Sequence, residues 1–179
     1  IPDSHPLACG VLGRSGTPVA SYFVNESDLL IVLGASFSNH TGIPTFRPII
    51  QVDFDQMTLG KFHKVDIPVW GEIGVTVDIL NESLKEFNAT SDRRSQIEKR
   101  KTHWKTEKES RAKDDKGNGI SSAAVFEAMN IIVPGNAVIT VDVGNNAYSF
   151  GRYFECKEQS VLMSGYLGSI GFGYPAAMG

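Results

Sequence analysis

The chain is poor in cysteine: Cys9 and Cys156 are the only two among 179 residues, and no Cys-x-x-Cys spacing occurs. This excludes a disulfide framework and a thiol-based zinc or redox site, and it favours two free, half-buried or buried thiols. No apolar run approaches the roughly 20 residues that span a bilayer. Residues 1–10 also lack a basic region followed by an apolar core. We therefore expect a cytoplasmic protein that is neither exported nor embedded in a membrane.

An excess of positive charge is missing as well. Lysine and arginine total 17 against 20 aspartates and glutamates, a formal net charge of −3. Nucleic-acid binders normally carry a basic footprint, so a nucleic-acid partner is disfavoured. Hydrophobic residues make up 41% of the chain, which excludes intrinsic disorder and predicts one ordinary domain or two small ones.

The charges that are present cluster in one segment. Residues 88–119 contain ten lysines and arginines and six aspartates and glutamates. Opposite signs alternate there, and Trp104 is the only aromatic residue of the segment. This pattern is typical of a solvated connector, either helical or irregular. We therefore predict a charged linker over 88–119.

Apolar runs alternate with amphipathic segments on both sides of this linker. Residues 28–34 and 48–53 are near-continuous apolar runs, typical of parallel strands covered on both faces. Segments 17–26 and 72–87 space their apolar residues at helical intervals. The alternation predicts an α/β fold, with parallel sheets and helices on both faces.

The same alternation continues after the linker. Ser121 or Ser122 can cap a helix that carries Val125, Met129 and Ile132, and a strand is expected over 137–143. The two α/β pieces, 1–87 and 120–179, are each short for this architecture. We expect the chain to be part of a longer enzyme.

Two glycine-containing motifs are candidates for cofactor binding. In Asp142-Val-Gly-Asn-Asn146, a glycine follows a strand and precedes a helix, whose free N–H groups attract phosphate. The second motif, residues 164–175, is rich in glycine and serine around the single β-branched residue Ile170. Each motif alone is also consistent with a plain turn or a closely packed helix start, and it is their pairing that indicates a ligand site.

Together with four shorter segments, these motifs resemble the thiamine-diphosphate (ThDP) dependent 2-oxoacid enzymes, which include acetolactate synthase, pyruvate oxidase and pyruvate decarboxylase. The segments that resemble the central domain of this family are 9–18, 28–37, 50–55 with 59–60, and 69–72. Residues 142–144 and 168–179 resemble the start of its diphosphate-binding domain, and the latter is the most specific match. The resemblance implies a partial Rossmann-like central domain over 1–87 and the N-terminal part of the diphosphate-binding domain over 120–179.

The resemblance also implies roles for individual residues. Gly144, Asn145 and Asn146 match the segment that contacts the diphosphate. Gly168 matches the glycine whose carbonyl accepts from the 4′-amino group of ThDP, with Ser169 beside it. Ile170 matches the apolar residue that bends ThDP and so presses this amino group against the thiazolium carbon; it is our one candidate catalytic residue.

Parts of the family pattern are missing from these residues. The Gly-Asp-Gly motif that binds Mg²⁺ would begin after Gly179, and the glutamate that activates the pyrimidine belongs to an N-terminal domain, normally that of a second subunit. No metal ligand is therefore assigned here, and we expect this piece alone to be inactive. By the same resemblance, the complete chain is expected to form a homo-oligomer.

FAD is a further cofactor of some relatives, and whether it is bound stays open. Several residues match places where flavin-carrying relatives touch FAD: Gly13, Arg14, Gly34, Ser36, Asp53, Phe54, Gly71 and Glu72. Against this, Ser36 and His40 stand near positions where acetolactate synthases carry arginines. The simple decarboxylases leave this domain empty.

The leading hypothesis is part of a ThDP- and Mg²⁺-dependent enzyme that decarboxylates a 2-oxo acid, with pyruvate the expected substrate, and transfers the two-carbon unit as acetolactate synthase does. Pyruvate oxidase-like or decarboxylase-like chemistry is the alternative within the family. A non-catalytic nucleotide-binding Rossmann module, with Gly10, Gly13 and Gly16 as its phosphate loop, is the alternative of another class. Its Gly-x-x-Gly-x-x-Gly spacing differs from G-x-G-x-x-G, and no strand precedes it.

Overall fold

A computed structural model describes residues 2–35, 41–87, 91–114, 117, 119–165 and 167–179. The chain divides into two compact units. One unit is discontinuous in sequence and contains residues 1–21 and 93–179; the other contains residues 22–92. Each is described by itself below. Within the described ranges, no helix has both the length and the apolar character that crossing a membrane requires.

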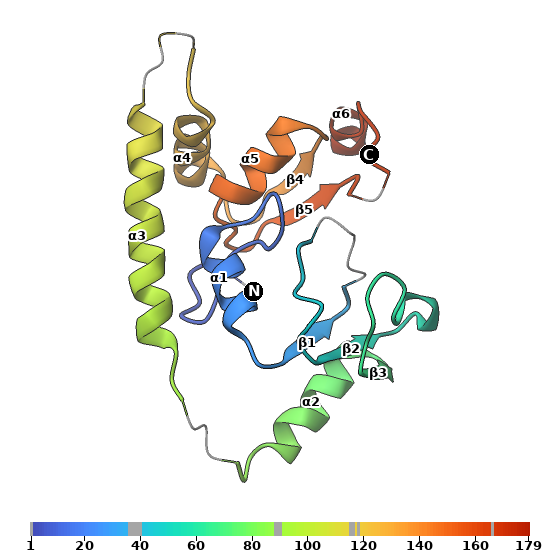
Figure 1. The fold of residues 1–179 in the computed structure, drawn as a ribbon. Helices are drawn as coiled ribbons and strands as arrows, with labels where there is room; N and C mark the ends of the chain where they lie inside the picture. Colours follow the sequence, from blue (N-terminus) through green and yellow to red (C-terminus); the bar gives the residue numbers. More distant parts are fainter. Residues whose placement is uncertain (1, 36–40, 88–90, 115–116, 118, 166) are drawn as a thin grey trace. The chain divides into compact units, whose positions relative to one another are not determined.

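The unit of residues 22–92 is built on a three-stranded parallel sheet in the order β1-β2-β3 (Figure 1). Its strands are β1 (Leu30–Leu33), β2 (Ile49–Asp53) and β3 (Ile67–Trp70). Leu30 pairs with Ile49, and Ile50 pairs with Ile67. The central strand β2 holds the core of this unit, since Ile49 and Val52 are fully buried. The two predicted strands are thereby confirmed.

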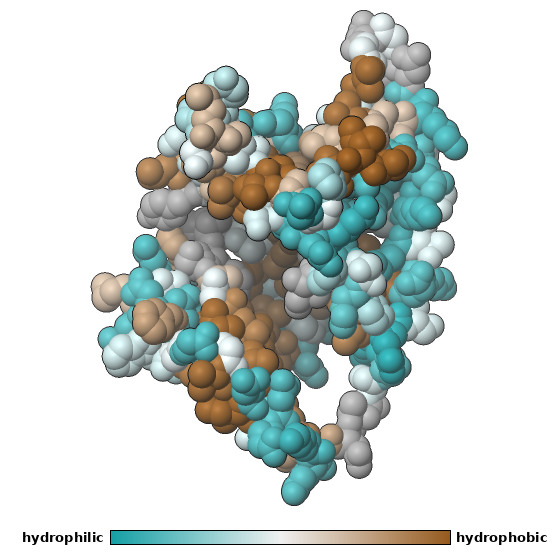
Figure 2. Space-filling model, turned by 180° about the vertical axis from the view of Figure 1, so that it is seen from behind, coloured by the Kyte–Doolittle hydropathy of each residue, from teal (hydrophilic) through white to brown (hydrophobic). Residues whose placement is uncertain are grey.

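One short and one regular helix accompany this sheet. The 3₁₀ helix η1 (Gln56–Thr58) follows β2, and α2 (Ile73–Ser83) follows β3 and packs on β2. Helix α2 ends four residues before the predicted bound, and none of its residues is buried. The apolar residues spaced at helical intervals therefore do not form a buried face here, and Leu80 and Leu84 are 37% and 53% exposed. Figure 2 shows apolar side chains on the surface over α2 and this sheet. The exposed apolar residues of these elements include Ile31, Leu33, Val75 and Ile79.

The other unit contains a two-stranded parallel sheet of β4 (Val138–Val141) and β5 (Ser160–Met163). Around it lie α3 (Arg94–Lys113), α4 (Ser122–Ile132), α5 (Asn145–Tyr153) and the short α6 (Gly173–Met178). The remaining helix, α1 (Pro18–Glu26), starts in this unit. The parallel pairing in both sheets confirms the predicted α/β class.

Side-chain hydroxyl groups cap the starts of α4 and α1. The Ser121 hydroxyl accepts from Ala124 N at 3.2 Å, so Ser121 and not Ser122 caps α4. At the start of α1, the Thr17 hydroxyl accepts from Ala20 N at 3.1 Å and donates to the Cys9 carbonyl at 2.6 Å. Of the residues expected along α4, Met129 packs on the core, whereas Val125 and Ile132 are 43% and 73% exposed.

The charged segment is mainly a regular helix, α3, which is one of the two forms that the sequence left open. It lies beside α4 (Figure 1). Ile97 and Trp104 are buried, and the Trp104 ring stacks on Tyr153 at 6.1 Å between centroids. Helix α3 is therefore packed into the unit along one side and does not only connect two parts. The domain bounds taken from the family resemblance stay a prediction.

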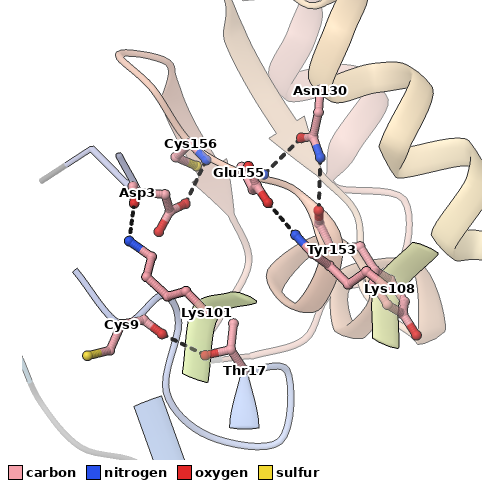
Figure 3. A network of polar contacts seen from close by, with 9 residues as sticks. All are labelled: Asp3, Cys9, Thr17, Lys101, Lys108, Asn130, Tyr153, Glu155 and Cys156. Atoms are coloured by element: carbon pink, nitrogen blue, oxygen red, sulfur yellow. Dashed lines mark hydrogen bonds and ion pairs between the residues drawn. The ribbon is translucent and has the colours of Figure 1, made fainter. Parts of the chain in front are cut away.

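The first residues of the chain close this unit through a polar network (Figure 3). Asp3 N donates to the Cys156 carbonyl at 2.9 Å, and the Asp3 carboxylate accepts from Cys156 N at 2.8 Å. Lys101 of α3 donates to the Asp3 carbonyl at 2.8 Å. Lys108 pairs with Glu155, whose N–H donates to the Asn130 side chain. Both cysteines are free and half-buried, as predicted, and burial raises the pKa of each thiol.

Candidate cofactor site

The two motifs predicted to bind ThDP follow neighbouring parallel strands. The turn 142–146 comes directly after β4, and the segment 164–172 comes directly after β5. Because β4 and β5 are parallel and paired, with Val141 opposite Met163, both strands end at the same edge of the sheet. The carboxyl edge of a parallel sheet is where ligands bind in open α/β folds.

The turn after β4 presents backbone N–H groups at its surface. Gly144 has φ 101° and precedes α5, and its carbonyl accepts from Ala147 N at 3.1 Å. A positive φ of this size favours glycine, which explains the residue type at the switch from strand to helix. Gly144, Asn145 and Asn146 are all exposed. Helix α5 therefore begins with accessible donors, the arrangement that suits a phosphate group.

The segment after β5 is held by its own first residue. The Ser164 carbonyl accepts from Gly168 N at 3.1 Å, and its hydroxyl accepts from Ser169 N at 3.2 Å. Gly168 has φ 61° and Gly171 has φ 89°, and both conformations favour glycine. In the described parts of the chain, the Gly168 carbonyl accepts no hydrogen bond, so it is available to an amino group.

Ile170, the candidate wedge, projects from this segment and is 92% exposed. An isoleucine side chain of this exposure contributes little to the core of its own unit. It lies directly beside Gly171, whose N–H reaches the carboxylate of Asp142 at 3.0 Å. The segment that carries Ile170 and the turn 142–146 are thus in direct contact.

Asp142 is the residue that joins the two motifs. Its carboxylate accepts from Val143 N at 2.7 Å, from Gly171 N at 3.0 Å and from Gly173 N at 3.1 Å. These backbone hydrogen bonds, first those from Val143 and Gly173, lower the pKa of Asp142. From the sequence, no role of its own was assigned to Asp142. The sequence signal that it offered was an acidic residue immediately after a buried strand, a position from which a carboxylate can reach a neighbouring loop.

The candidate FAD residues fall into two groups. Gly34, Asp53 and Gly71 lie at the carboxyl ends of β1, β2 and β3, with Phe54 and Glu72 directly after two of them. Gly34 N donates to the Val52 carbonyl at 2.9 Å, and Gly71 N to the Asp53 carbonyl at 3.1 Å, so one sheet edge gathers all five. Gly13 and Arg14 belong to the other compact unit. Ser36 and His40 lie outside the described residues.

The side chain of Glu72 caps helix α2 at this edge of the sheet. Its carboxylate accepts from Val75 N at 2.6 Å and caps α2, and the backbone hydrogen bonds from Val75 and then Gly74 lower its pKa. A contact from Glu72 to FAD would compete with this cap. Gly34 has φ 62°, and a Cβ there would lie 2.5 Å from Ile73 Cδ1, so the turn after β1 sits close to the start of α2.

The residues present fit one end of ThDP. Exposed N–H groups at the start of α5, an open carbonyl at Gly168 and an exposed isoleucine are grouped at one edge. The described residues contain no group of three or more histidines, cysteines, aspartates or glutamates arranged for a metal ion. The Asp142 carboxylate at this edge already accepts from three N–H groups.

Comparison with known protein families finds a match for the first part of the chain. Residues 1–80 match the family described as "Thiamine pyrophosphate enzyme, central domain". This confirms the resemblance drawn from the sequence, and the parallel α/β fold is consistent with it.

The chain is related in particular to large subunits of acetolactate synthase. It is 33% identical over its whole length to the probable acetolactate synthase large subunit of Methanococcus aeolicus. It is 36% identical over 99% of its length to that of Methanocaldococcus jannaschii, and 32% identical over its whole length to the acetolactate synthase isozyme 1 large subunit of Escherichia coli. The chain spans only about a third of these relatives, namely 33%, 32% and 32% of their lengths.

Proposed function

We propose that these residues are part of a ThDP- and Mg²⁺-dependent enzyme that decarboxylates a 2-oxo acid, with pyruvate as the substrate, and transfers the two-carbon unit as acetolactate synthases do. The observation that carries the proposal is the contact between the two motifs: Asp142 at the end of β4 binds Gly171 N, next to Ile170. This contact brings together two motifs that are far apart in sequence, as a single cofactor site requires.

The roles of the chain's own residues follow from this geometry and from the family resemblance. Gly144, Asn145 and Asn146 would hold the diphosphate with N–H and amide donors at the start of α5. The Gly168 carbonyl would accept a hydrogen bond from the aminopyrimidine, and Ile170 would set the bend of the cofactor. When bound, ThDP supplies a thiazolium ring that serves as an electron sink for decarboxylation. The Mg²⁺ ligands and the activating glutamate would come from outside these residues, the latter from a second copy in a homo-oligomer.

Binding of FAD is proposed only for the edge formed by Gly34, Asp53, Phe54 and Gly71. The support is that the carboxyl ends of three parallel strands gather these residues, and such edges bind nucleotides in related folds. FAD would distinguish an acetolactate synthase-like or pyruvate oxidase-like protein from a simple decarboxylase.

The test uses the whole polypeptide that carries these residues. Ile170→Ala should lower the rate of acetolactate formation from pyruvate by at least about tenfold. Without the isoleucine, the cofactor would no longer be held in the bent shape that brings its amino group to the thiazolium carbon. The melting temperature should stay unchanged, because the side chain is 92% exposed. Leu167→Ala is the matched control, since Leu167 lies in the same segment and is 80% exposed. Equal activity of the Ile170 variant and the wild type would remove the wedge assignment.

A second measurement separates the alternative class. Thermal shifts of the whole polypeptide are recorded with ThDP plus Mg²⁺, with FAD and with NAD. Stabilisation by ThDP plus Mg²⁺ supports the proposal, because a ligand that binds only the folded state raises its stability. Stabilisation by NAD alone would contradict it and favour a nucleotide-binding module.

A further inference from the structure

Two side chains at the end of β4 bind the backbone of Gly173, the first residue of α6, one at its carbonyl and one at its N–H. The Thr140 hydroxyl donates to the Gly173 carbonyl at 2.7 Å, and the Asp142 carboxylate accepts from Gly173 N at 3.1 Å. Thr140 and Asp142 are two residues apart at the end of β4, so they face the same side of the sheet. The same carboxylate also accepts from Gly171 N at 3.0 Å.

Gly173 allows the close approach that this arrangement needs. It is buried, and a Cβ at this position would lie 3.0 Å from Asp142 N and 3.1 Å from Asp142 Cβ. Since these neighbours are backbone or bound directly to it, a side chain at residue 173 would push the segment away from β4. The glycine, the threonine and the aspartate therefore form one unit, which we name the β4 clamp (Thr140, Asp142, Gly173).

The segment that the β4 clamp holds has few other supports. Leu167 and Ile170 are 80% and 92% exposed, and Gly168 and Gly171 have positive φ. Glycines lose more conformational freedom on folding than other residues. A ligand that had to order this segment would bind more weakly, whereas a segment already ordered binds without that cost.

We propose that Thr140 and Asp142 are positioning residues that fix residues 168–171 beside the diphosphate turn before the cofactor binds. The inference rests on the proposed ThDP site. Neither side chain needs to touch the cofactor, since both act through the backbone of Gly171 and Gly173. The carboxylate is required because it meets the two glycine N–H groups with two acceptor oxygens. An asparagine would turn its NH₂ group toward one of these donors.

The first arm of the test is made without cofactor on the whole polypeptide. Hydrogen exchange of the Gly171 and Gly173 amides is measured in the wild type, in Asp142→Asn and in Thr140→Val. We expect exchange to become at least about tenfold faster at both amides in Asp142→Asn and at Gly173 in Thr140→Val. Thr140→Ser should restore slow exchange, because it keeps the hydroxyl. Asp78→Asn, on the exposed side of α2, is the charge-matched control.

The second arm measures binding of ThDP in the presence of Mg²⁺ to the same variants. Asp142→Asn should raise the Kd for ThDP at least about tenfold, and Thr140→Val should raise it by a smaller factor, while Thr140→Ser and Asp78→Asn stay near the wild type. Thr140→Val tests the same inference if Asp142→Asn fails to fold, since valine keeps the shape of threonine.

The outcomes separate the inference from the proposed function. Unchanged amide exchange in both variants overturns the β4 clamp, whatever the wild type binds. Faster exchange with an unchanged Kd for ThDP overturns the positioning role alone. A wild type that binds no ThDP, with exchange still faster in the variants, overturns the proposed function and with it the positioning role. Faster exchange together with a raised Kd supports both.

Discussion

A single buried amide side chain organises the loops at the carboxyl edge of the three-stranded sheet. Gln51 of β2 is 3% exposed, and its Nε2 donates to the Ala35 carbonyl at 3.1 Å and to the Thr58 carbonyl at 3.4 Å. Its Oε1 accepts from Gly60 N at 2.8 Å. One residue thus satisfies backbone groups in the turn after β1, next to the candidate FAD residue Gly34, and at the end of η1.

Replacing this amide should therefore cost more than a surface change. Gln51→Leu keeps the approximate size but removes three part-buried hydrogen bonds to the backbone, each contributing about 0.5–1.5 kcal/mol. We expect a loss of about 2–4 kcal/mol in the free energy of unfolding, measured by urea denaturation. Gln56→Leu, on exposed η1, is the control and should change little. Equal losses in both variants would show that the Gln51 contacts do not hold these loops.

At the scale of elements, the sequence was most informative where its pattern was local. Strands β1 and β2 were predictable because their apolar runs are nearly continuous. Strand β5 was missed, since Ser160–Met163 is four residues long and follows the polar residues Glu158 and Gln159. The many charged residues of α3 gave no indication that this helix packs against the rest of its unit. Its two buried residues, Ile97 and Trp104, are seven positions apart and so lie on one helix face.

The loop of residues 10–16 offers an element-scale prediction because it packs on α5. A Cβ at Gly151 of α5 would lie 2.7 Å from the Ser15 carbonyl oxygen, and Arg152 donates to the Arg14 carbonyl at 2.8 Å. Alanine normally stabilises a helix relative to glycine by about 0.5–1 kcal/mol. Here the clash with backbone should reverse the sign, and we expect Gly151→Ala to destabilise by about 1–3 kcal/mol.

Thermal or urea unfolding measures this reversal. Gly135→Ala is the control, because the nearest atom to its added Cβ, a carboxylate oxygen of Glu158, is 4.0 Å away. A more stable Gly151→Ala variant would mean that the loop moves away without cost. The same loop carries Gly13 and Arg14, so its attachment to α5 bears on where these two candidate FAD residues are held.

At the scale of the whole molecule, the division into units was beyond sequence reasoning. One of the two compact units joins residues 1–21 to residues 93–179. Its closure depends on contacts such as Asp3 with Cys156, which are 153 positions apart and leave no periodic signal. The two candidate cofactor motifs, by contrast, can be picked out of the sequence because their glycine and isoleucine spacing is local, and their role stays a prediction. Asp142, which joins them, acts over 29 and 31 positions and was missed.

Trp104 tests whether this discontinuous unit unfolds as one. Its ring is 7% exposed and stacks on Tyr153, and Arg111 lies over it at 5.3 Å. Trp104→Ala should cost about 3–5 kcal/mol. Hydrogen exchange followed by mass spectrometry should show the loss of protection in peptides from residues 2–21 and 93–179. Peptides of β1, β2 and β3 should keep their protection, and Phe87→Ala, with a side chain 74% exposed, should change neither set. Equal loss in both sets would show that the two units unfold together, because cooperative units lose protection as a whole.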